Sequence, residues 1–119
     1  MADPRECLPL PAHDFQVLLL LMEGPRHAYG LSTAVENSPG DAVRLEIGSL
    51  YRILSRLTGQ GVIEDFMPSA GAQGHEARRR YYRITAFGRR VAQAEAARLD
   101  AVVRQARRHK LLPSGGGSR

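Results

Sequence analysis

The sequence predicts a mainly α-helical domain with a small β-hairpin and a long C-terminal helix. Residues 46–61 (EIGSLYRILSRLTGQG) carry leucine and isoleucine at three- and four-residue spacing, the pattern of a helix with one buried face. Gly59 and Gly61 end that helix, and an apolar pair typical of a strand follows at once. A short helix with arginines on its outer face, leading directly into a hairpin, is the arrangement of a winged helix-turn-helix, which presents this helix to the DNA major groove.

The composition fits one small globular domain. The chain has 119 residues, 43% of them hydrophobic, and no tryptophan, so we expect a modest aliphatic core. Its longest apolar run, residues 17–22, is too short to span a bilayer, and its first residues are acidic rather than basic, so we expect neither a membrane segment nor a signal peptide. The single cysteine, Cys7, excludes an internal disulfide and fits a cytoplasmic location.

The positive charge is concentrated in the C-terminal part of the chain. The net charge is +5, but residues 1–77 hold five of the 17 basic and ten of the 12 acidic side chains, which leaves residues 78–119 with a net charge of +10. Sixteen of the basic residues are arginines, which make bidentate contacts with phosphate and guanine. A GC-rich genome would also raise the arginine total, so the clustering is the better indication of a nucleic-acid partner.

The N-terminal part is predicted to contain two helices. Residues 1–12 hold three prolines and are expected to be irregular. A first helix should begin at His13 or Asp14 and end at Glu23, before Gly24-Pro25. Because it is apolar nearly all round, we expect it to contact a second chain as well as its own domain. A second helix is expected over residues 29–37, and with residues 46–61 it gives the helix-turn-helix.

The hairpin, or wing, should follow the helix of residues 46–61. Residues 62–67 are predicted to form one strand, residues 68–77 a flexible tip, and residues 78–84 the return strand. Period-two alternation turns Tyr82 and Ile84 inward and Tyr81 and Arg83 outward. The DNA-binding domain would therefore span residues 13–84.

A long helix should form the C-terminal part. Thr85 is the expected cap of a helix from Ala86 to about Lys110, about 40 Å long, within a dimerisation segment of residues 85–112 that precedes a flexible tail, residues 113–119. So long a helix cannot lie wholly on so small a domain, so its apolar stripe should pack on another chain in a homodimer. The expected dimer contacts from the first and last helices are Phe15, Leu18, Leu19, Val91, Leu99, Val102, Val103 and Ala106.

Three segments resemble those of a known family, the PadR-like transcriptional regulators. Residues 24–31 (GPRHAYGL) resemble the family's G-P-x-H-G-Y segment, and residues 48–57 (GSLYRILSRL) resemble its G-T-L-Y…L-x-R-L recognition helix. Residues 79–89 (RRYYRITAFGR) resemble its R-x-Y-Y-R-L-T-x-x-G ending. The resemblance covers roughly residues 14–112 in the family's order and indicates the short class with a single C-terminal helix.

The chain also departs from the family pattern. Ala28 replaces a glycine, Ile47 replaces a proline, and Glu46 stands where a capping serine often lies. Some members bind flat aromatic drugs between tryptophans in the dimer. This chain has no tryptophan, so that mechanism is not expected here.

The expected DNA contacts come mainly from the helix of residues 46–61 and from the wing. Arg52 and Arg56 lie one turn apart on the outer face, and one of them should contact base edges, while Ser49 and Tyr51 near the helix N-terminus should hold the backbone. The alternative is a solvated basic face. Three arginines at the start of the return strand should contact phosphate or the minor groove. A tyrosine at the start of the second helix should either bind the DNA backbone or pack in the core. These are Arg78, Arg79 and Arg80, and Tyr29.

The sequence carries no sign of catalysis. It has no nucleophile elbow, no P-loop and no paired acids in a glycine-framed pocket, so we expect no enzyme and no cofactor. The four histidines are scattered without ligand spacing, so no metal site is predicted.

These observations predict a homodimer that binds double-stranded DNA. Its two recognition helices should face successive major grooves of an inverted-repeat operator, about 34–36 Å apart. The resemblance implies a transcriptional repressor, released by a small-molecule effector whose identity the sequence does not indicate. Two alternatives stay open: a winged helix used for protein–protein contact, and a DNA-binding protein without sequence preference.

Overall fold

The computed structural model describes residues 2–37, 46–68 and 80–113. Its helices and strands, in chain order, are η1 (Pro4–Cys7), α1 (Ala12–Leu21), β1 (Arg26–His27), α2 (Ala28–Glu36), α3 (Ile47–Gly59), β2 (Ile63–Phe66), β3 (Tyr81–Ile84) and α5 (Ala86–Arg108). The predicted fold class is confirmed, because the described residues form a helical domain with one small sheet. The predicted hairpin tip and tail lie almost wholly outside the described residues.

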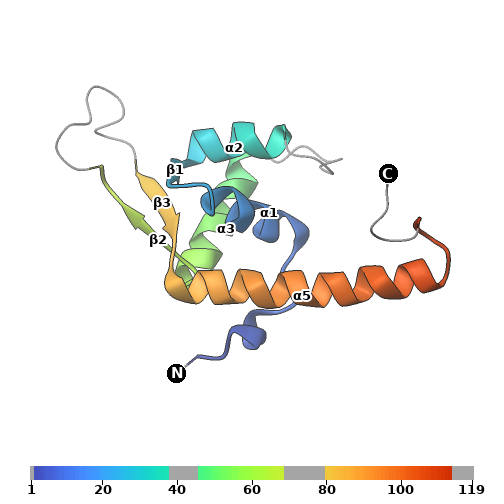
Figure 1. Ribbon diagram of the computed structural model, residues 1–119. Coiled ribbons are helices and arrows are strands. Elements are labelled where there is room, and N and C mark those ends of the chain that lie inside the picture. Colours follow the sequence, from blue (N-terminus) through green and yellow to red (C-terminus); the bar gives the residue numbers. More distant parts are fainter. Residues whose placement is uncertain (1, 38–45, 69–79, 114–119) are drawn as a thin grey trace.

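Helix α5 is the base on which the other elements are arranged (Figure 1). Helix α1 contacts the N-terminal part of α5, and α2 and α3 pack on α1 and on each other. The turn η1 lies against the other side of α5, and the hairpin projects from the end of the domain where α5 begins. The C-terminal half of α5 extends beyond the rest of the domain. No helix of the described ranges is long and apolar enough to cross a membrane.

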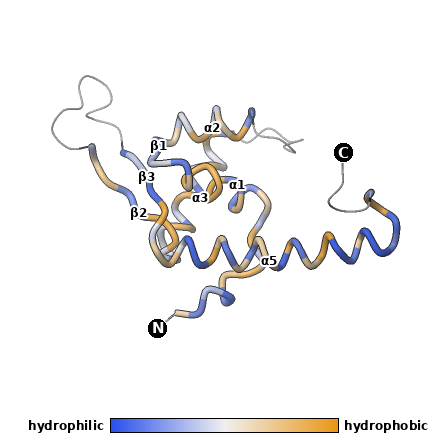
Figure 2. Tube along the Cα trace, in the orientation of Figure 1, coloured by the Kyte–Doolittle hydropathy of each residue, from blue (hydrophilic) through white to orange (hydrophobic). Residues whose placement is uncertain are grey.

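The core is aliphatic, as the composition predicts. Helix α3 buries Leu50, Ile53, Leu54 and Leu57, the stripe predicted from its periodicity, and this buried face leaves the opposite face free. The hydropathy colouring shows the same gathering of apolar residues where α1 and α3 meet (Figure 2). The other helices and the sheet complete the core with Val17, Leu18, Leu21, Leu31, Val35, Val62, Ile63 and Val91.

The sheet has three strands in the order β1-β3-β2, all antiparallel to their neighbours. In β3, Tyr82 and Ile84 are buried and Arg83 is exposed, as predicted, whereas Tyr81, predicted to point outward, is half-buried against the rings of His27 and Phe66. Strand β1 was not predicted. It has only two residues, too few to show an alternating pattern, and it exists because it pairs with Tyr81 and Tyr82 of β3.

The N-terminal segment is more ordered than predicted. Asp3 accepts a hydrogen bond from the backbone N–H of Arg5 (2.9 Å) and caps the 3-10 turn η1, in which Pro4 occupies the first position, where its missing N–H costs nothing. Leu10 is buried in the core. Glu95 of α5, also buried, accepts hydrogen bonds from Arg98 and the Leu10 backbone, and these hold its pKa below the usual value.

The prediction that His13 or Asp14 opens the first helix is wrong. Helix α1 begins at Ala12 after Pro11, and it ends at Leu21 rather than Glu23. Asp14 lies inside the first turn with an exposed fraction of 1%. Its carboxylate serves a tertiary contact, described below, rather than a helix cap.

The junction between the hairpin and α5 is tightly defined. Thr85 caps α5 as predicted: its Oγ1 accepts from Gly88 N (2.9 Å) and donates to the carbonyl of Gly61 (2.7 Å). Thr85 N donates to the carbonyl of Val62 (3.1 Å). A Cβ on Gly88 would lie 2.0 Å from that carbonyl oxygen, so only glycine fits there. Helix α5 is thereby attached directly to the corner where α3 ends and β2 begins.

Candidate nucleic-acid interface

The exposed face of α3 is opposite its buried stripe. At 100° per residue, Gly48, Arg52, Ser55 and Gly59 lie near the centre of this face, and all four are exposed. Tyr51 and Thr58 lie on the side toward the hairpin, whereas Ser49 and Arg56 lie on the side toward α1. A Cβ on Gly48 or Gly59 would meet nothing within 4 Å, so the surface of α3 is open at both ends.

Arg56 is engaged within the chain. Its Nε and Nη2 donate to the two carboxylate oxygens of Asp14 (3.1 and 2.7 Å), and this pairing raises the pKa of the guanidinium. Asp14 is buried, while the Arg56 side chain keeps 46% of its surface exposed. Such a bidentate pair with a buried carboxylate ties α3 to α1. Arg56 therefore has a structural role in positioning α3.

Arg52 has no such partner. Its Nη2 donates to Ser49 Oγ (3.0 Å), and this is the only polar contact that the described residues give it. Among the described arginines of α3 and the sheet, it alone lacks a carboxylate partner. The other ion pairs are Arg26–Glu23 (2.8 Å), Arg56–Asp14 (2.7 Å), Arg80–Asp65 (2.6 Å) and Arg83–Glu64 (2.7 Å). Arg52, at the centre of the exposed face, is thus the described arginine of α3 that keeps no carboxylate partner.

Two of the predicted DNA-contacting tyrosines are exposed. Tyr51 of α3 and Tyr29 of α2 keep 54% and 68% of their surface exposed. The core-packing alternative for Tyr29 is therefore excluded. Both phenol groups are open to a ligand outside the domain.

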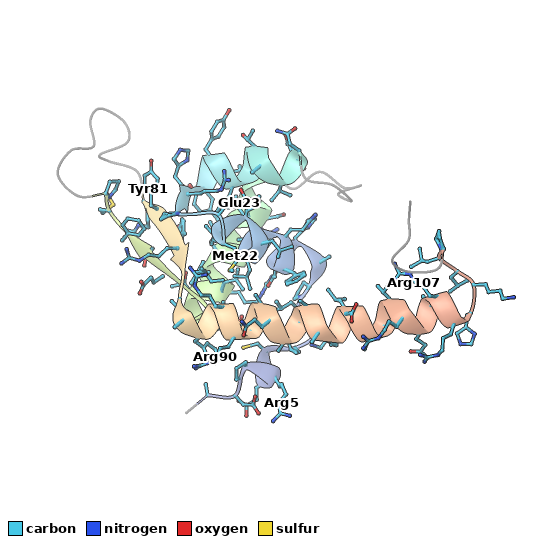
Figure 3. All side chains as sticks on the ribbon, viewed as in Figure 1. Arg5, Met22, Glu23, Tyr81, Arg90 and Arg107 are labelled. Carbon is cyan, nitrogen blue, oxygen red and sulfur yellow. The ribbon has the colours of Figure 1, made fainter. Side chains whose placement is uncertain are left out.

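His27 explains the resemblance of residues 24–31 to the family segment. Its Nδ1 accepts a hydrogen bond from Gly30 N (3.0 Å) and so caps α2. Its ring packs edge-on against Tyr81 of β3, with 5.3 Å between the ring centroids; Tyr81 is labelled in Figure 3. His27 thereby joins the start of α2, and with it Tyr29, to the sheet. Sequence reasoning missed this role, because the contact with Tyr81 links distant parts of the chain.

The hairpin contributes a groove beside α3. Its volume is about 420 Å³, and the helix and the hairpin form its two walls. Burial raises the pKa of Tyr82, one of the lining residues. Arg80 lies at this groove with Asp65, whereas Arg78 and Arg79 lie outside the described residues. The groove is lined by Tyr51, Leu54, Ser55, Thr58, Gly59, Asp65, Arg80 and Tyr82.

The predicted dimer residues fall into three groups by exposure. Leu18 and Val91 are fully buried in the core of the single chain, so they have no surface to offer a partner, and their prediction as contacts is corrected on this ground. Leu19 and Val102 are about half exposed, and the remaining four, Phe15, Leu99, Val103 and Ala106, are partly buried. Met22, which follows α1 and is labelled in Figure 3, is a further exposed apolar residue that the prediction omitted.

The outer face of α3 carries hydrogen-bond donors from several side chains. The described part of the chain contains no group of three histidine, cysteine or carboxylate side chains that could hold a metal ion. The described residues of α3 present the guanidinium of Arg52, which has no carboxylate partner among them, several hydroxyl groups and the exposed phenol of Tyr51.

Comparisons with known proteins agree with this geometry. The model of the transcriptional regulator PadR-like family matches residues 17–94. A PadR family transcription regulator from Clostridium difficile has the same fold, with a TM-score of 0.72 and 17% identity over 83% of this chain and 98% of that chain. A PadR family transcriptional regulator from Eggerthella lenta has a TM-score of 0.64 and 26% identity over 94% of this chain and 87% of that chain.

A protein from Lysinibacillus sphaericus, Uncharacterized protein X, is 30% identical over 76 residues, which cover 64% of this chain and 67% of that protein. The family match covers more than half of the chain and includes α3, the sheet and the start of α5. The chain therefore belongs to the PadR-like family of transcriptional regulators.

Proposed function

We propose that this regulator is a cytoplasmic homodimeric repressor that reads an inverted-repeat operator through Arg52 of α3. The observation that supports this most directly is the position of Arg52, central on the exposed face and without a carboxylate partner among the described residues. Arginine binds guanine O6 and N7 in the major groove through two parallel hydrogen bonds. Moving from Ser49 to a base would cost Arg52 only one exposed hydrogen bond.

The other exposed groups would hold the DNA backbone. Tyr29, Tyr51 and Ser49 would donate to phosphates beside the base contact, and the wing arginines Arg78, Arg79 and Arg80 would contact phosphates or the minor groove. Arg56 would act indirectly, by holding α3 against α1.

Dimerisation would supply the symmetry of the operator. The free half of α5 carries a stripe of apolar residues, and Leu19 and Met22 expose further apolar surface near α1. A two-fold pairing through these surfaces would place two α3 helices in successive major grooves. Repression would follow from blocking polymerase, and an effector that changes the angle between the two subunits would release it.

Binding to the DNA upstream of the protein's own gene tests this function. Fluorescence anisotropy would compare that duplex with a scrambled duplex of equal length across a salt series. We expect Arg52→Ala to weaken binding to the preferred duplex about 10- to 100-fold, corresponding to about 1–3 kcal/mol for a bidentate base contact. Arg5→Ala is the matched control, because Arg5 is exposed and lies across α5 from α3 (Figure 3).

The same titrations distinguish the alternatives. Equal binding to both duplexes with a steep salt dependence would indicate a DNA-binding protein without sequence preference. No binding to either duplex at low salt would overturn the DNA-binding proposal and favour a protein partner for the exposed face of α3.

A further inference from the structure

The described arginines of the hairpin are paired with acids of β2. Arg80 Nη1 lies 2.6 Å from Asp65 Oδ2, and Arg83 Nε lies 2.7 Å from Glu64 Oε2. Neighbouring residues of a strand point to opposite faces, so the two pairs lie on opposite sides of the sheet. Asp65 and Arg80 line the groove beside α3, and Glu64 and Arg83 do not.

With one exception, the polar groups that line the groove are suited to binding a sugar-phosphate strand. Its α3 wall offers the hydroxyl groups of Tyr51, Ser55 and Thr58, and its hairpin wall offers the guanidinium of Arg80. These are donors for phosphate oxygens. The exception is Asp65, the one carboxylate among the described lining residues. The Asp65 carboxylate already pairs with the guanidinium of Arg80, which a phosphate would otherwise contact.

We propose that Asp65 is an intramolecular competitor of DNA that lowers the affinity of the protein for every duplex. This inference rests on the proposed function. In the free protein the carboxylate takes the place of a phosphate on Arg80. A DNA strand that contacts both α3 and the wing must displace it and then bear a negative charge nearby. Breaking the Arg80–Asp65 pair costs free energy, so sequence-independent binding is weaker than the arginine content suggests.

Asp65→Asn tests this inference, because it keeps the shape of the side chain and removes its charge. We expect it to tighten binding to both the upstream duplex and the scrambled duplex about three- to tenfold near 0.1 M salt. The slope of log K against log salt should change by much less than about 0.9, the value for one phosphate contact, because Arg80 contacts the DNA in both proteins once Asp65 is displaced. Asp65→Ser serves if the asparagine variant does not fold, as judged by thermal unfolding.

Glu64→Gln is the matched control. It changes the net charge equally, on the neighbouring residue of the same strand, but on the face away from the groove. Its partner Arg83 also lies over the ring of Phe66, with 4.3 Å from the guanidinium carbon to the ring centroid. We expect Glu64→Gln to change affinity less than twofold.

The double variant Asp65→Asn/Arg80→Ala shows whether Asp65 acts through Arg80. If it does, the gain seen with Asp65→Asn should disappear in the Arg80→Ala background. A gain that persists there, or an equal gain with Glu64→Gln, would overturn the competitor role in favour of a general charge effect.

A result on the single variant separates this inference from the proposed function. If wild type binds DNA through Arg52 and Asp65→Asn leaves the affinity unchanged, this inference alone fails. If wild type binds no duplex, the proposed function fails and this inference fails with it.

Discussion

Two arginines one turn apart on α3 have different chemical surroundings. Arg56 is held by a carboxylate that water cannot reach, whereas Arg52 is held only by the hydroxyl of Ser49, at the surface. The outer face of α3 therefore combines a structural guanidinium and a free one. No local pattern distinguishes them, because Asp14 lies 42 residues before Arg56. The sequence supports the pair of candidates, and the choice between them needs the tertiary contact.

Arg56→Ala should destabilise the domain, because it leaves the Asp14 carboxylate buried without its cation. We expect the free energy of unfolding to fall by about 3 kcal/mol, the low end for a broken buried pair, since water reaches the guanidinium side. Urea denaturation followed by circular dichroism measures this value. Arg52→Ala, on the same helix face, should change it by less than about 0.5 kcal/mol. Equal stability of the two variants would refute the structural role of Arg56.

At the scale of whole elements, local patterns account for α2, α3, α5 and the two hairpin strands, but not for the turn η1 and the strand β1. Helices α2, α3 and α5 have boundaries within two residues of prediction, because periodicity, glycine and the Thr85 cap act within each segment. Strand β1 and the turn η1 depend on partners from elsewhere in the chain. Their residues alone carry no pattern that predicts them.

The junction between the hairpin and α5 also gives a physical reason for the T-x-x-G segment, Thr85 to Gly88. Gly88→Ala would place a methyl group against the backbone carbonyl of Val62, and no side-chain rotation can relieve that contact. We expect a loss of about 2 kcal/mol or more in the free energy of unfolding, as for overpacked sites, measured by urea denaturation. Gly59→Ala is the control, because a Cβ there meets nothing. It should be neutral or slightly stabilising. A similar result for both variants would show that α5 can shift to accommodate the methyl group.

For the molecule as a whole, α5 would link DNA reading to chain pairing in the proposed dimer. Its first turn is attached to the corner where α3 ends, and its last turns lie beyond the domain. A change in how two α5 helices pair would therefore alter the orientation of the two α3 helices. The sequence predicted the length and the apolar stripe of this helix. The sequence could not show that Val91 packs in the core of its own chain rather than against a second chain. A helix that packs on its own domain and a helix that pairs with another chain have the same apolar periodicity.

Val102→Glu tests the proposed pairing without disturbing the core, because Val102 is 49% exposed within the single chain. A carboxylate in an apolar interface should convert the dimer to a monomer at micromolar concentration, as measured by sedimentation velocity. Since a monomer contacts one half-site, operator affinity should also fall by at least about tenfold, while the melting curve stays cooperative. Ala101→Glu adds the same charge about 150° away around the helix from the centre of the stripe and should leave the dimer intact. A Val102→Glu variant that remains dimeric would place the contact elsewhere, with Leu19 and Met22 as the next surface to substitute.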